Sequence, residues 1–258
     1  MAELKEIIEF MEESFPLFYK ADFDNVGLLA GRKDREVTKV LLCLDCDKFV
    51  VQEAINEGAQ LIISHHPVIF GGVKSVTDAD PDGEMLVTAI ENGISIYCAH
   101  TNLDSCPDGL TDCLCRRLGL EPIEPIEGND GRICEPEGEL RLLELCARIK
   151  AELGLEAVAT TAQMNRQVKR VAVCNGSGGG MADAAREKGA DVFITGDVKY
   201  HQVREMYLTE GFEYIEVNHY DSEKIVTELL FDRIKARFGS RLEAVISKEN
   251  CPPLTVVG

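Results

Sequence analysis

The sequence has neither a cluster of basic residues nor a long apolar run. Lysine and arginine together number 27 and aspartate and glutamate 45, so the formal net charge is −18. Such an acidic surface repels polyanions, and nucleic acid is therefore not an expected partner. The longest apolar runs, such as residues 40–44, are too short to cross a bilayer, and the charged first residues are unlike a secretory signal. We expect a cytoplasmic protein that does not bind a membrane.

Ten cysteines are present, but their spacing matches neither a disulfide framework nor a structural zinc site. Disulfide-rich chains are usually small and secreted. The pairs Cys43-x-x-Cys46 and Cys113-x-Cys115 stand alone, whereas structural zinc usually needs two pairs or a pair with histidines. We therefore expect reduced thiols packed as small hydrophobic side chains, and a metal or redox role for either pair is the less favoured alternative.

Short apolar runs alternate with helical patterns in the order typical of an α/β fold. An amphipathic helix is expected over residues 4–15. Buried strands are expected over residues 40–44, 61–63 and 95–99. The same order returns later, with strands expected over residues 171–174, 192–195 and 214–217. At an offset of 131 residues, six of 27 aligned positions are identical, and they include the helix-capping glycines Gly58 and Gly189.

This duplication predicts two pseudo-repeated α/β lobes, each with a small, mainly parallel sheet and flanking helices. We place an N-terminal lobe at residues 1–125 and a C-terminal lobe at residues 126–258, which together form one functional unit. Residues 122–138 are rich in Pro, Glu and Gly and are expected to be a linker or surface segment. Further helices are expected over residues 139–153 and 222–238. Polar residues gather at the carboxyl ends of the strands, so we expect a metal site between the lobes.

Histidines and carboxylates at these strand ends form the strongest chemical signal. His65 and His66 leave one strand end in different directions, so the pair can serve two metal ions. His219 and Glu223 are spaced i, i+4, which places both on one helical face, and Asp104 adds a second carboxylate. Imidazole nitrogen and carboxylate oxygen bind divalent metals, and two ions held close together activate a shared water. We predict that these five residues are metal ligands.

Each motif has a simpler interpretation when taken alone. A His-His pair often ends a strand without binding metal, and His-x-x-x-Glu is common on solvated helices. The placement of His100-x-x-x-Asp104 and His219-x-x-x-Glu223, each directly after a third strand, favours the metal interpretation. His100 is interpreted as a residue that orients a ligand, and the alternative is that it binds metal itself.

Six motifs, in order from residue 24 to residue 223, resemble one known family. They are Asp24-Asn-Val-Gly-Leu, Ile63-Ser-His-His-Pro-Val-Ile-Phe70, His100-Thr-Asn-Leu-Asp104, Asn175-Gly-Ser-Gly-Gly-Gly180, Thr195-Gly-Asp-Val-Lys-Tyr-His201 and Asn218-His-Tyr-Asp-Ser-Glu223. The chain is similar to the GTP cyclohydrolase 1 type 2 homologs, also called interacting-factor-three-like proteins, in their compact form without an inserted domain. Many relatives carry Gly where this chain has Asn218, and Asn tolerates the same left-handed backbone. The resemblance implies a ring-shaped homohexamer with metal pairs facing an internal cavity, and it implies the same five ligands.

The resemblance also implies a hydrolase that acts on C–N bonds, with a small-molecule substrate such as a nucleotide. In that reading His100 or His201 moves protons, Lys199 meets a phosphate, and Asp24 and Asn25 line the pocket. Mixed nitrogen and oxygen ligation fits two ions of zinc, iron, manganese, cobalt or nickel. The alternative is a non-catalytic hexameric scaffold that binds metal or a partner.

A third class, dinucleotide binding, rests on the glycine-rich run from Gly176 to Gly180, which follows a strand and opens a helix. Asp197 lies close to the expected acidic position of that motif. Met181, however, occupies the place of the third small residue, where its bulk opposes close packing of helix and strand. We therefore disfavour a nucleotide cofactor, and the glycines are assigned either to a tight turn or to a close approach to substrate.

Overall fold

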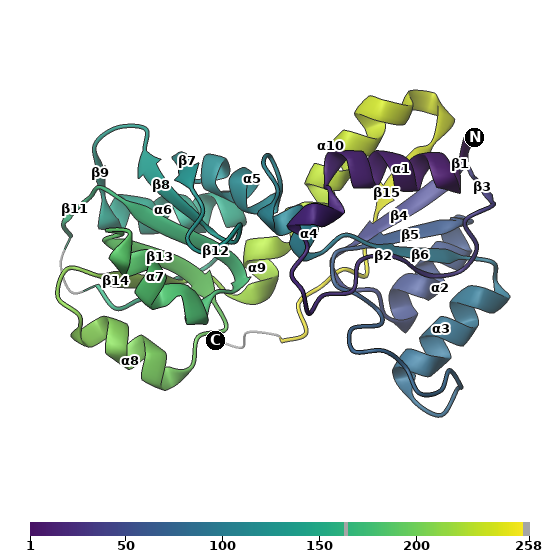
Figure 1. Ribbon diagram of the computed structural model, residues 1–258, viewed down its shortest axis with the longest axis horizontal. Helices are drawn as coiled ribbons and strands as arrows, with labels where there is room; N and C mark the ends of the chain where they lie inside the picture. The colour runs from purple at the N-terminus through teal and green to yellow at the C-terminus, as the bar shows by residue number, and fades with distance from the viewer. Residues whose placement is uncertain (163–164, 255–258) are drawn as a thin grey trace. The chain divides into compact units, whose positions relative to one another are not determined.

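The computed structural model describes residues 1–162 and 165–254. The chain divides into two compact units: Met1–Leu103 together with the residues from Val226 onward, and Asp104–Ile225. None of the helices in the described part of the chain has the length and apolar composition needed to cross a membrane. Both units combine helices with a β-sheet, which confirms the α/β class (Figure 1).

The division between the units differs from the expected boundary at residue 125. Strand β15 (Glu243–Ile246) pairs in parallel with β4 (Lys39–Cys43), so the end of the chain completes the sheet of the first unit. Helix α10 (Val226–Phe238) packs against the same two strands. Strand β7 (Leu120–Glu124) belongs instead to the sheet of the second unit. The observed boundary depends on strand pairing between residues distant in sequence. Local sequence patterns do not predict such pairing, so the boundary expected at residue 125 differs from the observed one.

The first unit has a five-stranded sheet in the order β15-β4-β5-β6-β2. Strands β5 (Leu61–Ser64) and β6 (Ser95–Cys98) continue the parallel pairing, and β2 (Gly27–Ala30) is antiparallel at the edge. Helices α1 (Leu4–Ser14) and α10 cover one face, and α2 (Lys48–Glu57) and α3 (Pro81–Glu91) cover the other (Figure 1). Small additional strands, β1 (Ala2–Glu3) and β3 (Glu36–Val37), pair with each other. The sheet of this unit is mainly parallel, as expected.

The second unit has a six-stranded sheet in the order β10-β14-β13-β12-β8-β7. Its parallel centre consists of β12 (Val171–Ser177), β13 (Val192–Gly196) and β14 (Glu213–Glu216). Strands β10 (Ala159–Thr160), β8 (Arg132–Pro136) and β7 extend it by antiparallel pairing. Of the two alternatives for residues 122–138, a linker or a surface segment, the linker is wrong, because most of this segment forms β7 and β8. Most of the prolines and glycines of this segment belong to the turn between β7 and β8 and to these strands at the edge of the sheet. They do not form a connection between lobes.

The helices of the second unit surround this sheet. Helices α7 (Ala182–Glu187) and α8 (Tyr200–Leu208) pack through Ala185 and Met206 onto the cluster that contains Phe193. Helix α5 (Leu110–Arg117) contacts β7, β8 and β12, and α9 (His219–Glu223) contacts β12 and β13. Helix α6 (Leu142–Leu153) follows β9 (Leu140–Arg141), which pairs with β11 (Gln167–Val168).

The duplication seen in the sequence is confirmed by strand register. Val40 of β4 lies opposite Leu61 of β5, and Val171 of β12 lies opposite Val192 of β13, so the offset of 131 residues is kept in both pairs. The capping glycines Gly58 and Gly189 both have positive φ, 66° and 78°. Polar ends of the first three parallel strands of each unit therefore occupy equivalent places.

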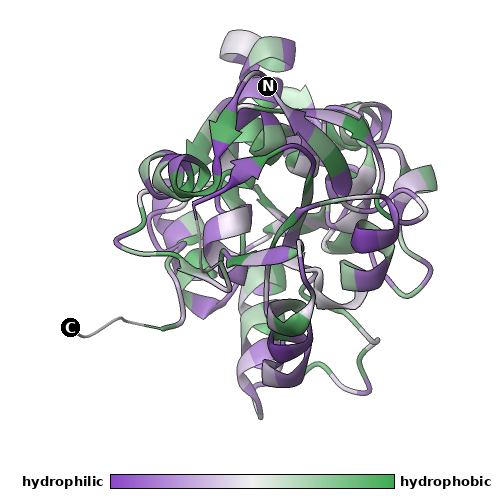
Figure 2. Cartoon of the chain, turned by 90° about the vertical axis from the view of Figure 1, so that its left-hand side faces the viewer, coloured by the Kyte–Doolittle hydropathy of each residue, from purple (hydrophilic) through white to green (hydrophobic). Residues whose placement is uncertain are grey.

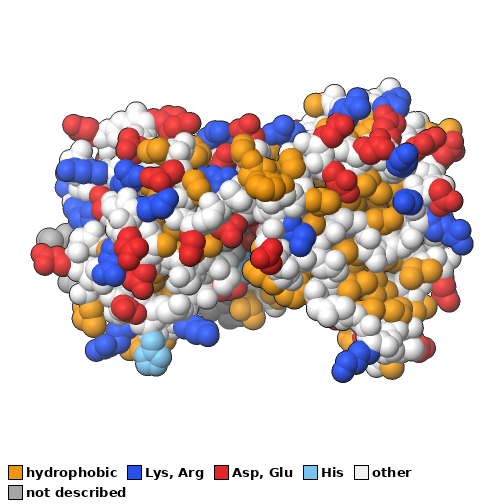
Figure 3. Space-filling view, in the orientation of Figure 1, with side chains coloured by type: hydrophobic (Ala, Val, Ile, Leu, Met, Phe, Trp, Pro, Cys, Tyr) orange, Lys and Arg blue, Asp and Glu red, His pale blue; other side chains and the backbone are white. Residues whose placement is uncertain are grey.

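Side-chain distribution agrees with this layered arrangement. Helices carry hydrophobic and hydrophilic residues on different sides, and the central strands are mainly hydrophobic (Figure 2). Acidic and basic side chains are interspersed over the face drawn in Figure 3, in keeping with an acidic chain that has no basic cluster. All ten cysteines lie in the described part of the chain and are free thiols, as expected, and Cys43, Cys98 and Cys146 are buried.

Candidate metal centre

The first unit brings three histidines together at the carboxyl ends of two neighbouring strands. His65 and His66 directly follow β5, and His100 follows β6 just before α4 (Thr101–Ser105). One ring nitrogen from each of the three lies within 4.8 Å of the other two, a spacing that could hold a metal ion. We call these three residues the histidine group. Parallel strands deliver their ends to one edge of a sheet, which is why residues 34 positions apart meet here.

Both predicted ligands of this group have their Nδ1 atom held by an acceptor. Nδ1 of His65 lies 2.8 Å from the carbonyl oxygen of Ala99, and Nδ1 of His66 lies 2.7 Å from Oδ1 of Asp45. A histidine that donates from Nδ1 presents the lone pair of Nε2, which is the common arrangement of metal-binding histidines. Asp45 was not expected from the sequence, although it directly follows the first parallel strand.

His100 is oriented by a buried carboxylate. Its Nδ1 lies 2.9 Å from Oδ1 of Asp24, and Oδ2 of Asp24 accepts from the backbone N–H of Thr101 at 3.1 Å and from its hydroxyl. Burial raises the pKa of Asp24, but the hydrogen bonds from His100 and Thr101 outweigh it and hold the pKa well below its ordinary value. Asp24 was expected to line a substrate pocket; the structure shows it holding His100.

The second unit brings together the other three predicted ligands, Asp104, His219 and Glu223, which we call the acidic group. Nε2 of His219 lies 2.9 Å from Oε2 of Glu223, so the i, i+4 spacing does place both on one face of α9. Nδ1 of His219 lies 2.7 Å from Oδ2 of Asp197, at the end of β13. Asp197 therefore has the same relation to His219 that Asp45 has to His66. The sequence had placed it in a family motif and near the acidic position of a nucleotide motif, without a role beside His219.

The carboxylates of the acidic group are joined through one side chain. Nδ2 of Asn175 donates to Oδ1 of Asp104 at 2.7 Å and to Oε1 of Glu223 at 3.1 Å. Next to it, Gly176 has a φ of 63°, and a Cβ there would collide with Oε1 of Glu223 and press on Nε2 of His219. The first glycine of the glycine-rich run thus clears space for the acidic group, which explains it without a nucleotide cofactor.

These groups fit divalent metal ions. The donors are imidazole nitrogens held through Nδ1 and carboxylate oxygens, the set that zinc, iron, manganese, cobalt and nickel share. The missing Cβ of Gly176 leaves space beside Oε1 of Glu223 and Nε2 of His219. Among the described residues, the clusters that could hold a metal ion contain histidine, aspartate and glutamate and no cysteine. Burial raises the pKa of the Cys43 and Cys174 thiols well above the ordinary value.

His201 belongs to neither of these two groups. It is exposed in the first turn of α8, with its ring 5.4 Å from that of Tyr200. Within the described residues, His201 is in none of the clusters that could hold a metal ion. Its predicted catalytic role, like that of Lys199, stays a prediction.

Comparison with known proteins agrees with these motifs. The Duf34/NIF3 (NGG1p interacting factor 3) family matches residues 2–253. A GTP cyclohydrolase 1 type 2 homolog of Clostridium perfringens is 35% identical, covering 99% of this chain and all of the relative, and one of Clostridium acetobutylicum is 30% identical over 97% of each.

Solved structures show the same fold over nearly the whole chain. The Staphylococcus aureus hypothetical protein SA1388 is 29% identical, with a TM-score of 0.88 and 99% coverage of both chains. Reduced HcgD from Methanocaldococcus jannaschii is 27% identical, with a TM-score of 0.83 and coverage of 96% and 98%. These matches and the ordered motifs lead to one conclusion. The chain belongs to the Duf34/NIF3 family.

Proposed function

We propose that this chain binds two divalent metal ions through His65, His66, Asp104, His219 and Glu223. The observation that carries the proposal is the pair of carboxylates behind two of the histidines. Asp45 and Asp197 each accept from Nδ1, at 2.7 Å, and so direct Nε2 of His66 and of His219 toward a ligand position. Such carboxylate–histidine pairs orient metal ligands and raise their basicity.

We further propose that the metal pair serves hydrolysis of a C–N system, of the kind named in the GTP cyclohydrolase 1 type 2 homologs. Two bound divalent ions supply a water of lowered pKa and polarise the attacked group. His100 then accepts and releases a proton at Nε2, because its Nδ1 is paired with Asp24. The substrate is a small molecule such as a nucleotide, Lys199 is the residue proposed to meet its phosphate, and His201 is the alternative proton carrier.

Metal content and turnover of matched variants test this proposal. Gently purified protein is expected to hold two metal equivalents per chain by elemental analysis, and Glu223→Ala fewer. A screen of nucleotides with the metal found is expected to give turnover that Glu223→Ala and His100→Ala lose. His201→Ala separates the two proton carriers, since it is expected to keep most activity if His100 is the carrier. Fewer than half an equivalent, even after reconstitution, would remove the catalytic proposal.

The second candidate is a non-catalytic scaffold that binds metal or a protein partner. It is favoured by the family description as an interacting factor. Loss of cellular function in Glu223→Ala supports the enzyme, whereas unchanged function in that variant supports the scaffold. We also propose a homohexamer in the cytoplasm, following the family resemblance, and light scattering of the purified chain is expected to give six times 28.5 kDa.

A further inference from the structure

We infer that Asn175 is the positioning residue that sets the metal affinity of the acidic group. The residue is 7% exposed, and its side-chain amide donates to both Asp104 and Glu223. The inference rests on the proposed metal binding and goes beyond it, because Asn175 is not itself a predicted ligand. Asn175 is the fifth residue of β12 and is therefore held by the backbone of the sheet.

The direction of this amide is supported by a third partner. Oδ1 of Asn175 accepts from the hydroxyl of Thr111 at 2.6 Å, and this hydroxyl oxygen also lies 2.9 Å from the backbone carbonyl of Asp104. The two carboxylates favour the orientation of the amide in which Nδ2 faces them, and a hydroxyl that donates to Oδ1 supports that orientation. Thr111 therefore helps to keep the amide oxygen turned away from two negative groups.

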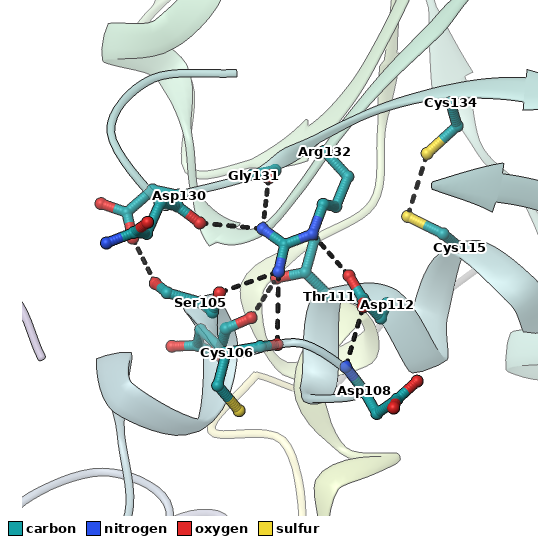
Figure 4. A network of polar contacts seen from close by, with 12 residues as sticks. Ser105, Cys106, Asp108, Thr111, Asp112, Cys115, Asp130, Gly131, Arg132 and Cys134 are labelled. Carbon is teal, nitrogen blue, oxygen red and sulfur yellow. Dashed lines mark hydrogen bonds and ion pairs between the residues drawn. The ribbon is translucent and has the colours of Figure 1, made fainter. Parts of the chain in front are cut away.

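Thr111 and Asp104 are in turn fastened by a buried guanidinium. Arg132 donates from Nε to Oδ1 of Asp112 at 2.5 Å, and from its terminal nitrogens to the carbonyls of Ser105 and Cys106 (Figure 4). These contacts hold both ends of the turn between α4 and α5. The backbone of Asp104, one residue before this turn, has little freedom to move away from Asn175.

A neutral double donor suits this position better than any charged side chain. Two carboxylates that share one site repel each other when no cation is bound. The amide engages one oxygen of each and lowers this repulsion, yet it adds no positive charge that would compete with a metal ion. Lysine would neutralise the group, and aspartate would add a third negative charge. Asn175 thus keeps the acidic group arranged for metal before metal arrives, which saves the cost of ordering it on binding.

Replacing Asn175 by leucine keeps the number and branching of the side-chain heavy atoms and removes both donors. We expect Asn175→Leu to bind zinc or cobalt 10- to 100-fold more weakly in competition with a chromophoric chelator, the range typical when a residue that orients ligands is lost. The visible absorption spectrum of the cobalt-loaded protein is expected to change as well, because the carboxylates change their orientation. Tyr214→Phe is the matched control, since it removes one buried hydrogen bond of the same unit, to the Thr195 carbonyl, without touching the acidic group.

Thr111→Val serves if Asn175→Leu does not fold, and it is expected to weaken metal binding in the same direction by releasing the amide to flip. Wild-type affinity and an unchanged cobalt spectrum in a folded Asn175→Leu or Thr111→Val would overturn the inference and leave the metal proposal standing. Absence of metal binding in the wild-type chain would overturn both. An equal loss of affinity in Tyr214→Phe would show a general loss of stability and would also overturn the positioning role.

Discussion

Asp197 accepts the Nδ1 hydrogen of His219 at 2.7 Å from a backbone whose φ is 51°. Left-handed φ is uncommon outside glycine, although aspartate and asparagine tolerate it best. The residue is therefore held in a costly conformation at the point where it meets a predicted metal ligand. Asp197 thus combines an uncommon backbone conformation with the orientation of a predicted metal ligand.

Asp197→Asn is expected to lower metal affinity about 10- to 100-fold with little change in stability. Asparagine keeps the left-handed backbone and removes only the charge behind the imidazole. Isothermal titration with zinc and thermal unfolding of the metal-free protein measure the two effects separately. Asp108→Asn is the control, because Asp108 also has a positive φ, 57°, and its carboxylate accepts from Arg116. Equal effects of the two substitutions on affinity would contradict the assignment.

In the first unit, Asp45→Asn is expected to weaken metal binding by a similar factor, because Nδ1 of His66 loses its charged acceptor. Asp47, two residues later, offers a matched control. It caps α2 by accepting from the N–H groups of Phe49 and Val50, so Asp47→Ala should cost about 1 kcal/mol of stability and leave affinity unchanged. The prediction fails if Asp45→Asn changes only the unfolding midpoint in urea.

Arg132→Met is expected to destabilise the protein by about 3–5 kcal/mol, since it leaves Asp112 and several carbonyls in a buried site without their donor. Arg116→Met removes a more exposed pair with Asp108 and should cost about 1 kcal/mol or less. Urea unfolding of the metal-free proteins gives both values. Similar losses in the two variants would show that the buried pair is no more important to folding than an exposed one.

The lowered pKa of Asp24 predicts a specific dependence on pH. Because the folded state holds this pKa below the ordinary 3.8, its contribution to stability is complete above that value and is lost as pH falls through the folded pKa. The gap in unfolding free energy between wild type and Asp24→Asn is therefore expected to be constant from pH 7 to pH 5 and to shrink below pH 4. Urea unfolding at several pH values measures it, and a constant gap down to pH 2 would contradict the prediction.

Much of the fold followed from local patterns in the sequence. The alternation of short apolar runs with capped helices located β4, β5 and β6 and their repeats β12, β13 and β14, and the offset of 131 residues survives in the strand register. What could not follow is long-range pairing. Nothing in the sequence of Glu243–Ile246 predicts that it pairs with Lys39–Cys43. The proline in β7 favoured a linker over the strand that the structure shows.

The candidate site shows the same division. Histidine spacing and the i, i+4 rule identified the predicted ligands, because parallel strands end at one edge of a sheet. The supporting residues Asp45, Asp197 and Asn175 were not assigned that role, since each touches a side chain that lies far along the sequence. Their common signal is position, because each lies near or just beyond the carboxyl end of a parallel strand.

The return of the chain to the first unit after Ile225 has a consequence for synthesis on the ribosome. Residues 104–225 are translated in full before β15 exists, so the second unit is an insertion that can fold while the first still lacks an edge of its sheet. Until translation nears its end, β4 exposes an unpaired edge rich in valine and leucine. Stalled or C-terminally truncated chains should therefore aggregate through the incomplete sheet of the first unit, while the second unit is already folded.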